Sequence, residues 1–176
     1  MAVDRKHSDV FSPEKRSNVM RSIGRRDTRP EMQLRRLLSA HGFRYRLKRP
    51  DLPFSPDLVF PTARLAVFVH GCFWHGHACH LFRWPRSNAD FWRAKIERNV
   101  QRDLRVESEL LSLGWRCFTV WECAFRGRCR LDPVTVASAV RSALADPQTH
   151  NGHVPHGNRV EMSPFVGEMN AFIPDI

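Results

Sequence analysis

The sequence lacks a long apolar run, an internal repeat and any pair of cysteines at the spacing of a common zinc knuckle. A membrane-spanning helix needs about 20 consecutive apolar residues, so we expect no contact with a membrane. The chain also shows no secretory signal, and its 5 cysteines are an odd number. These features disfavour a disulfide framework, and they favour free or metal-bound thiols in a reducing cytoplasm.

Acidic residues are in the minority. The 18 acidic residues face 28 basic ones, which gives a net charge of +10 over 176 residues. Such an excess favours a polyanionic partner, with nucleic acid as the default, although a solvated basic surface would give the same composition. The length suits one domain with extensions. We place a flexible arm at residues 1–11, the domain at 12–146 and a poorly ordered tail at 147–176, where no hydrophobic period is visible.

Two cysteines and four histidines gather in the short run from residue 69 to residue 80. Cys72, His77 and Cys79 offer the sulfur and imidazole ligands that tetrahedral zinc prefers. Cys123, which follows another β-like run, is the best candidate for a fourth ligand. The metal would then fasten the ends of two neighbouring strands. The alternative is a set of buried free cysteines beside a surface histidine cluster.

Two helices are expected before the first strand. Residues 12–24 begin with a Ser-Pro-Glu start signal and carry Met20 among arginines that include Arg21 and Arg26, an arrangement suited to contact with phosphates. Thr28 and Glu31 form a capping-box pattern for the next helix, which ends at Gly42. Glu31 therefore has a structural explanation as well as a possible catalytic one.

The middle of the chain predicts strands. Residues 43–47 alternate apolar and basic side chains, as a strand with one wet face would. Asp57 precedes an apolar segment at 58–60, and a turn at 61–64 leads to a nearly all-apolar strand at 65–69. A short turn makes these two strands antiparallel, which brings Asp57 close to Val69 and His70.

The second half predicts a long helix from the Ser87–Asp90 region to Gly114, a strand at 115–121 and a last helix from Asp132 to Ala145. The apolar stripe expected for the long helix is Trp92, Ile96, Val100, Leu104 and Leu111. A second face carries a basic row of Lys95, Arg98, Arg102 and Arg105. Such a row is either a solvated face or a contact with a nucleic-acid backbone.

A β-rich core flanked by helices, with polar clusters at strand ends, is the arrangement of a metal-dependent nuclease. Asp57 would hold Mg²⁺, and the backbone carbonyl of Val69 could add a second oxygen ligand. His70 or His75 could accept the proton of the attacking water. The adjacent Phe73 and Trp74 are either core residues or a wedge that enters the DNA base stack, most easily at a mismatch.

The sequence resembles the very-short-patch-repair (Vsr) DNA mismatch endonucleases. The resemblance runs in order from about residue 12 to residue 128, and its most specific part is the run from Phe68 to His75 followed by His77 and Cys79. Further matching segments are Asn18–Arg21, Arg26–Thr28 with Glu31, Pro56–Asp57, Phe91–Trp92 with Lys95–Ile96, Asn99–Val100, and Gly114–Arg116 leading to Val120–Ala124.

The resemblance implies an α/β fold with a restriction-endonuclease-like core, a mixed central β-sheet flanked by helices and a structural zinc site. It implies nicking 5′ to the thymine of a T:G mismatch left by deamination of 5-methylcytosine, on double-stranded DNA in a bacterial-type cytosol. The catalytic residues would be Asp57 on Mg²⁺, His70, His75 and Glu31, with zinc on Cys72, His77, Cys79 and Cys123. DNA contacts would come from Met20, Phe73, Trp74, Arg21, Arg26, Lys95 and Asn99.

The chain departs from the family pattern in few places. Val69 stands where a threonine can occur, a change that a backbone contact tolerates, and Cys117 and Cys129 are expected to be free thiols. We expect a monomer that acts alone on the duplex or with other repair proteins. Two other hypotheses stay open: a nickase without mismatch preference, and a zinc-stabilised DNA-binding protein that cuts nothing. A neighbouring cytosine-5 methyltransferase gene would favour repair.

Overall fold

A four-stranded mixed sheet forms the centre of the protein. The computed structural model describes residues 14, 26–47, 49–52, 54–146 and 151–154. The strand order is β1 (Leu58–Phe60), β2 (Leu65–His70), β3 (Arg116–Trp121) and β4 (Asn151–His153). β1 runs antiparallel to β2, whereas β2, β3 and β4 are parallel to one another. The predicted mixed sheet and the antiparallel β1–β2 pair are confirmed.

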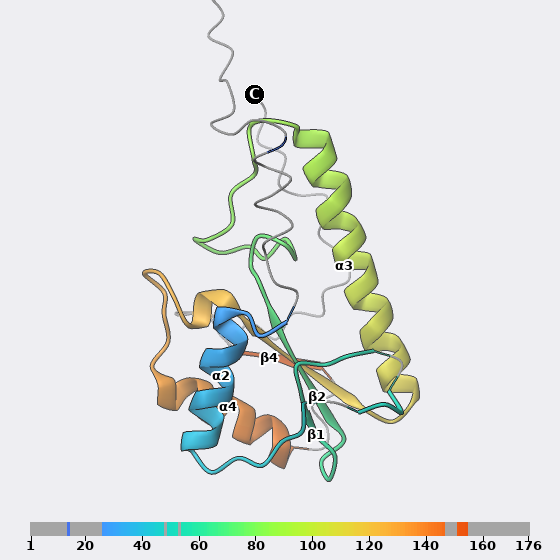
Figure 1. Cartoon of the computed structure of the whole chain (residues 1–176), viewed down its shortest axis with the longest axis vertical. Coiled ribbons are helices and arrows are strands. Elements are labelled where there is room, and N and C mark those ends of the chain that lie inside the picture. Colours follow the sequence, from blue (N-terminus) through green and yellow to red (C-terminus); the bar gives the residue numbers. More distant parts are fainter. Residues whose placement is uncertain (1–13, 15–25, 48, 53, 147–150, 155–176) are drawn as a thin grey trace, which may run out of the picture.

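Helices cover both faces of this sheet (Figure 1). α2 (Arg29–Ala40) and α4 (Pro133–Ala145) lie on one face, and the long α3 (Ala89–Ser112) lies on the other. Alternate residues of β2 reach the two layers, because successive side chains of a strand point to opposite faces. Leu65 and Val67 join the core with Leu34, Leu38 and Val140, whereas Ala66 packs with Val106 and Leu110 of α3.

The apolar stripe of α3 differs from the predicted one. Trp92 and Ile96 are buried as expected, but Leu104 and Leu111 are 37% and 43% exposed. Four residues turn about 40° more than one full turn of a helix. A stripe made of four-residue steps therefore moves gradually off the helix face that lies against the sheet. The face that lies against the sheet instead alternates steps of four and three and passes through Trp92, Ile96, Asn99, Asp103, Val106 and Leu110.

Residues 43–47 form an isolated bridge rather than the predicted strand. Arg46 and Val59 exchange two backbone hydrogen bonds of 2.8 Å, and the pairing extends no further. The predicted alternation of side chains still holds, because Phe43 and Tyr45 pack on Phe60 while Arg44 and Arg46 are exposed. β1 has only three residues, so it offers few backbone groups for the 43–47 segment to pair with.

The structure also adds β4 inside the stretch predicted as a tail. Its residues pair with Cys117, Phe118 and Thr119 of β3, and Val154, which follows it, is 2% exposed. Backbone pairing with an edge strand needs no hydrophobic period, so the sequence pattern carried no signal for it. Residues 1–13, 15–25, 147–150 and 155–176 lie outside the described part, and with them the predicted arm, most of the 12–24 helix, and the rest of the tail.

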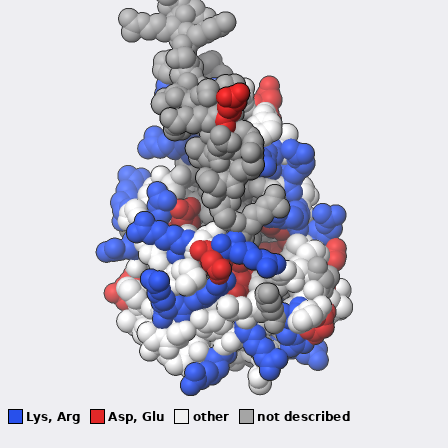
Figure 2. Space-filling view, in the orientation of Figure 1, with Lys and Arg blue, Asp and Glu red and all other residues white. Residues whose placement is uncertain are grey.

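No described helix is both long and apolar enough to cross a membrane. Basic side chains are spread over the face shown in Figure 2, with fewer acidic groups between them. The excess of basic residues that the composition shows is therefore visible on this face.

Candidate active site and candidate metal centre

The antiparallel pairing of β1 and β2 places Asp57 beside the end of β2. Because Leu58 pairs with Val67, Asp57 lies one residue beyond the pair and its backbone N–H donates to the carbonyl of Val67 at 3.0 Å. Its carboxylate Oδ2 accepts the N–H of Val69 at 2.7 Å. The predicted proximity of Asp57 to Val69 is therefore confirmed at atomic contact.

Asp57 sits in an electrostatically unfavourable position for a lone carboxylate. Burial raises its pKa to about 6, and the charge of Glu31 adds to the rise, while the hydrogen bond from Val69 and the charge of Arg35 oppose it. The carboxylates of Asp57 and Glu31 together place negative charge in a half-buried position. A hard divalent cation on the oxygen donors would relieve this excess, so the residues fit Mg²⁺.

Glu31 is 4% exposed and fully hydrogen-bonded. Its Oε2 accepts the N–H of Asp27 at 2.9 Å and its Oε1 accepts the Thr28 hydroxyl at 2.8 Å. Arg35 adds an ion pair at 3.3 Å. Thr28 is the N-cap residue, but its hydroxyl makes no cap bond, and Glu31 accepts the N–H of Asp27 rather than that of Thr28, so the predicted reciprocal capping box does not form. Glu31 thus supports the helix start and also lies near Asp57.

The two predicted catalytic histidines stack on one another. The rings of His70 and His75 are nearly parallel, with centroids 3.8 Å apart and planes 9° from parallel. His70 ends β2, and His75 lies in the loop that turns back over it. Burial lowers the pKa of His70 to about 3, with a further contribution from the charge of His75. His70 is therefore a neutral imidazole near pH 7.

Asp103 completes this group and was missed by the sequence analysis. Its carboxylate Oδ2 forms a hydrogen bond and ion pair with Nδ1 of His75. Burial works to raise the pKa of Asp103, but the hydrogen bond with His75 and the charges of the two histidines outweigh it and lower the pKa. An ionised carboxylate on Nδ1 fixes the tautomer of His75 and leaves Nε2 as the proton acceptor.

A second cluster gathers four ligand residues of the predicted zinc site. One ligand atom from each of Cys72, His77, Cys79 and Cys123 lies within 4.8 Å of all the others. Nδ1 of His77 is 3.3 Å from Sγ of Cys72 and 3.7 Å from Sγ of Cys123. The parallel pairing of β2 with β3 makes this possible, because His70 pairs with Trp121 and the two following segments start side by side.

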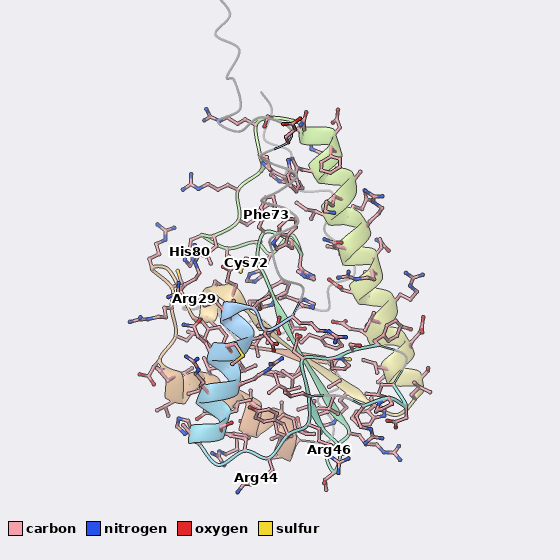
Figure 3. The ribbon with its side chains drawn as sticks, viewed as in Figure 1. Arg29, Arg44, Arg46, Cys72, Phe73 and His80 are labelled. Atoms are coloured by element: carbon pink, nitrogen blue, oxygen red, sulfur yellow. The ribbon has the colours of Figure 1, made fainter. Side chains whose placement is uncertain are left out.

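The chemistry of this second cluster fits zinc. The neighbouring Cys123 thiol and burial both raise the pKa of Cys72, and burial raises that of Cys79, so the thiols resist ionisation without a cation. Three sulfurs and one imidazole nitrogen are a tetrahedral zinc donor set. The ring of His77 stacks on Trp121 at 4.0 Å, which orients its Nδ1 toward the sulfurs. Figure 3 marks Cys72 in the loop beyond β2.

Phe73 and Trp74 form part of an aromatic cluster on α3. Both are half-buried, and their ring centroids lie 5.2 and 6.0 Å from that of Trp92. Asn99 donates from Nδ2 to the carbonyl of Trp74 at 2.8 Å. Gly76 passes so close to α3 that an added Cβ would lie 3.0 Å from Cγ2 of Ile96. The loop is therefore held against the helix, with its aromatic pair at the molecular surface.

The remaining predicted contacts are more dispersed. Arg26 is exposed and Lys95 is half-buried, and neither joins the two clusters. Arg102 of the predicted basic row pairs with Asp103 at 3.0 Å, so it belongs to the histidine group rather than to a free basic face. Met20 and Arg21 lie outside the described residues.

Comparison with known proteins identifies the family of the chain. The family model for the DNA mismatch endonuclease Vsr matches residues 8–81. The type II nicking enzyme V.XorIIP of Xanthomonas oryzae pv. oryzae is 50% identical over 116 residues, which are 66% of this chain and 85% of that protein. The DNA mismatch endonuclease Vsr of Escherichia coli K12 is 47% identical over 124 residues, 70% of this chain and 80% of that protein.

A third relative, the type II nicking enzyme V.NmeAIP of Neisseria meningitidis serogroup A, is 42% identical over 125 residues, 70% of this chain and 89% of that protein. The fold and the two clusters, each of which could hold a metal ion, fit a nuclease. The chain belongs to the Vsr family of DNA mismatch endonucleases. It is a DNA endonuclease, a hydrolase of phosphodiester bonds.

Proposed function

We propose that the protein nicks one strand of DNA 5′ to the thymine of a T:G mismatch, in the very short patch repair of deaminated 5-methylcytosine. The proposal includes a restriction-endonuclease-like core and a cytoplasmic setting, where such mismatches arise on the chromosome. The observation that carries it is the convergence of Asp57 and the His70–His75–Asp103 group at one end of β2.

Asp57 would hold Mg²⁺, together with the backbone carbonyl of Val69, and Glu31 would add negative charge beside them. When bound, the ion would polarise the scissile phosphate and stabilise the leaving oxyanion. The hydrogen bond from Val69 keeps the Asp57 carboxylate in one orientation before any ligand arrives. Such preorganisation reduces the reorganisation needed at the moment of reaction.

His75 is the best candidate for the general base. Asp103 holds its Nδ1, so Nε2 can accept the proton of the attacking water. The imidazolium that forms is stabilised by the Asp103 carboxylate, as in other carboxylate–histidine pairs. His70 is neutral, and its stacked ring limits the rotation of His75.

The cluster of Cys72, His77, Cys79 and Cys123 would hold a structural zinc ion. Four protein ligands fill a tetrahedral site and leave no open position for a substrate. Its place between the segments after β2 and β3 suits a role in holding the His75 loop. The zinc would therefore support catalysis only by fixing the loop.

Phe73 and Trp74 would enter the base stack at the mismatch, where unstacking costs least. Asn99 would fix the depth of this wedge through the Trp74 carbonyl. Met20, Arg21, Arg26 and Lys95 are proposed DNA contacts around it. In the absence of DNA the two rings rest on Trp92, so entering the duplex would exchange one aromatic contact for another.

A nickase without mismatch preference is the second candidate, because two of the three relatives described above are named as type II nicking enzymes. The same catalytic group would serve both functions. The two functions would differ only in how the Phe73–Trp74 wedge is used. A DNA-binding protein that cuts nothing is less consistent with the geometry, since binding needs neither a carboxylate-oriented histidine nor the Asp57 carboxylate held at Val69.

The test uses an end-labelled duplex with one T:G mismatch and its fully paired twin, each incubated with protein and Mg²⁺. One nick 5′ to the mismatched thymine, absent from the twin and from Asp57→Ala, supports the proposal. Equal cutting of both duplexes supports the nickase. Tight binding by wild type with no cutting of either duplex supports the binder and contradicts both enzyme hypotheses.

A further inference from the structure

Trp84 is a large apolar side chain that the fold leaves in solvent. It is 52% exposed, whereas Trp92 and Trp115 are 8% and 6% exposed and the other two tryptophans are half-buried. It lies in the segment that joins the cysteine–histidine cluster to the start of α3. Exposing a tryptophan forgoes the free energy that burial of its ring would give, and where such a ring belongs to a contiguous aromatic surface it points to a binding role.

The indole is held in place rather than loose. Its ring contacts Phe82 edge-to-face at 5.0 Å, and Phe82 in turn lies 6.2 Å from Phe73. Phe73 contacts Trp74 at 5.3 Å, so the aromatic row runs without a break from the proposed wedge to Trp84. A ligand that reaches the wedge therefore meets Trp84 along the same surface.

The surroundings of Trp84 are basic. Arg83 and Arg86 flank it in the sequence and are exposed, and the Arg93 guanidinium lies 6.0 Å from the ring centroid. The stretch 80–96 contains four Lys or Arg residues and one acidic residue, Asp90. An aromatic ring among arginines is complementary to a chain of sugars and phosphates, because the ring packs on the sugar or base and the cations pair with phosphates.

We propose that Trp84 and its three arginines, Arg83, Arg86 and Arg93, form a second DNA contact that grips the strand flanking the mismatch. The inference rests on the proposed function in one respect, which is that the ligand is DNA. The indole packs against a nucleotide beside the site where the wedge enters, and the arginines neutralise the neighbouring phosphates. This contact supplies affinity that is shared by matched and mismatched duplexes, while the wedge supplies the discrimination.

Three variants test the aromatic contact: Trp84→Ala, Trp84→Phe and the control Leu113→Ala. Leu113 is 50% exposed and follows the opposite end of α3. We expect Trp84→Ala to raise the dissociation constant for paired and T:G duplexes alike, by about five- to fiftyfold by fluorescence anisotropy. Trp84→Phe should retain most of the affinity, and Leu113→Ala should bind like wild type.

Two further measurements separate contact from folding. Replacing the three arginines with alanine should reduce the slope of log K against log salt by about two to three, since each phosphate contact contributes about 0.9. DNA should reduce the quenching of wild-type tryptophan fluorescence by acrylamide. Trp84→Phe should remove most of the fluorescence that acrylamide can quench, with or without DNA.

The inference is overturned if Trp84→Ala binds both duplexes with a dissociation constant within about twofold of that of wild type. It is overturned as well if Trp84→Phe loses as much affinity as Trp84→Ala and both variants have a lower melting temperature than wild type. It is also overturned if the arginine variant keeps the wild-type salt slope. Wild-type nicking with an unaffected Trp84→Ala defeats this inference alone, whereas a wild type that neither binds nor nicks defeats the proposed function.

Discussion

Two clusters at the end of β2 contain similar residues but have opposite designs. The cysteine–histidine cluster is a closed set of four ligand residues, three of them buried, with the imidazole stacked on Trp121. The neighbouring group of His70, His75 and Asp103 is half-buried, mixes nitrogen with oxygen, and begins at His70, next to the Val69 that Asp57 binds. The comparison indicates that a closed, soft set builds structure, whereas a partly open, mixed set leaves room for a substrate.

The largest expected effect comes from opening the closed cluster. Cys123→Ser removes the thiol ligand that the segment after β3 supplies to this cluster. We expect zinc content to fall from about one per chain to near zero, with a loss of at least about 10 °C in melting temperature, since structural zinc contributes folding free energy directly. Elemental analysis and circular dichroism check both.

The matched control is Cys129→Ser, which changes a half-buried thiol outside the ligand set. It should keep both zinc and melting temperature. A Cys123→Ser protein that retains zinc and stability would remove the structural half of the comparison.

A smaller effect is expected from the mixed group. Asp103→Asn keeps the size of the side chain but no longer fixes the tautomer of His75, so we expect the nicking rate to fall by about a hundredfold or more, with binding unchanged. Single-turnover nicking at several pH values measures this. Arg102→Ala, which removes the exposed partner of Asp103, should cost much less. Equal losses in the two variants would argue against a positioning role for Asp103.

Stability should depend on Asp57 in a defined pH window. Its pKa is raised from 3.8 to about 6 in the folded protein, so ionisation opposes folding above about pH 6 and has no effect below about pH 3.8. Asp57→Asn keeps the acceptor for Val69 and should stabilise the magnesium-free protein by about 1–3 kcal/mol at pH 8, and less at pH 5. Urea unfolding at the two pH values tests this sign, and a larger gain at pH 5 would contradict it.

The smallest effect concerns the wedge. Asn99→Ala removes one hydrogen bond to the Trp74 carbonyl, worth about 1 kcal/mol, and should lower the T:G preference by about three- to tenfold. Gln101→Ala, on the exposed side of the same helix, is the control. Unchanged preference in Asn99→Ala would show that the loop holds its aromatic pair without this contact.

The sequence was most informative where chain neighbours make the site. The run from Val69 to Cys79 predicted the ligand cluster, and the short turn after β1 predicted Asp57 beside Val69, because a turn of a few residues allows one pairing. Local spacing was enough in both cases, and only the partner Cys123 had to be inferred from a second strand end.

Long-range partners were harder to find. Asp103 and Asn99 reach the site from α3, 28 and 25 residues from the groups that they contact. A signal existed: both lie on the buried face that alternates steps of four and three, and polar residues on such a face need partners. The choice of four-residue steps hid Asp103, whereas Asn99 was named only as a DNA contact implied by the family resemblance. β4 gave no signal at all, since its pairing is by backbone alone.

The most direct test of the central claim measures zinc content and nicking on the same samples of wild type and Asp57→Asn across a magnesium titration. The account predicts about one zinc per chain in both proteins throughout. It predicts magnesium-dependent nicking of the T:G duplex by wild type alone. Nicking by Asp57→Asn, or nicking by wild type that follows zinc content and ignores magnesium, would contradict the division into one structural and one reactive cluster.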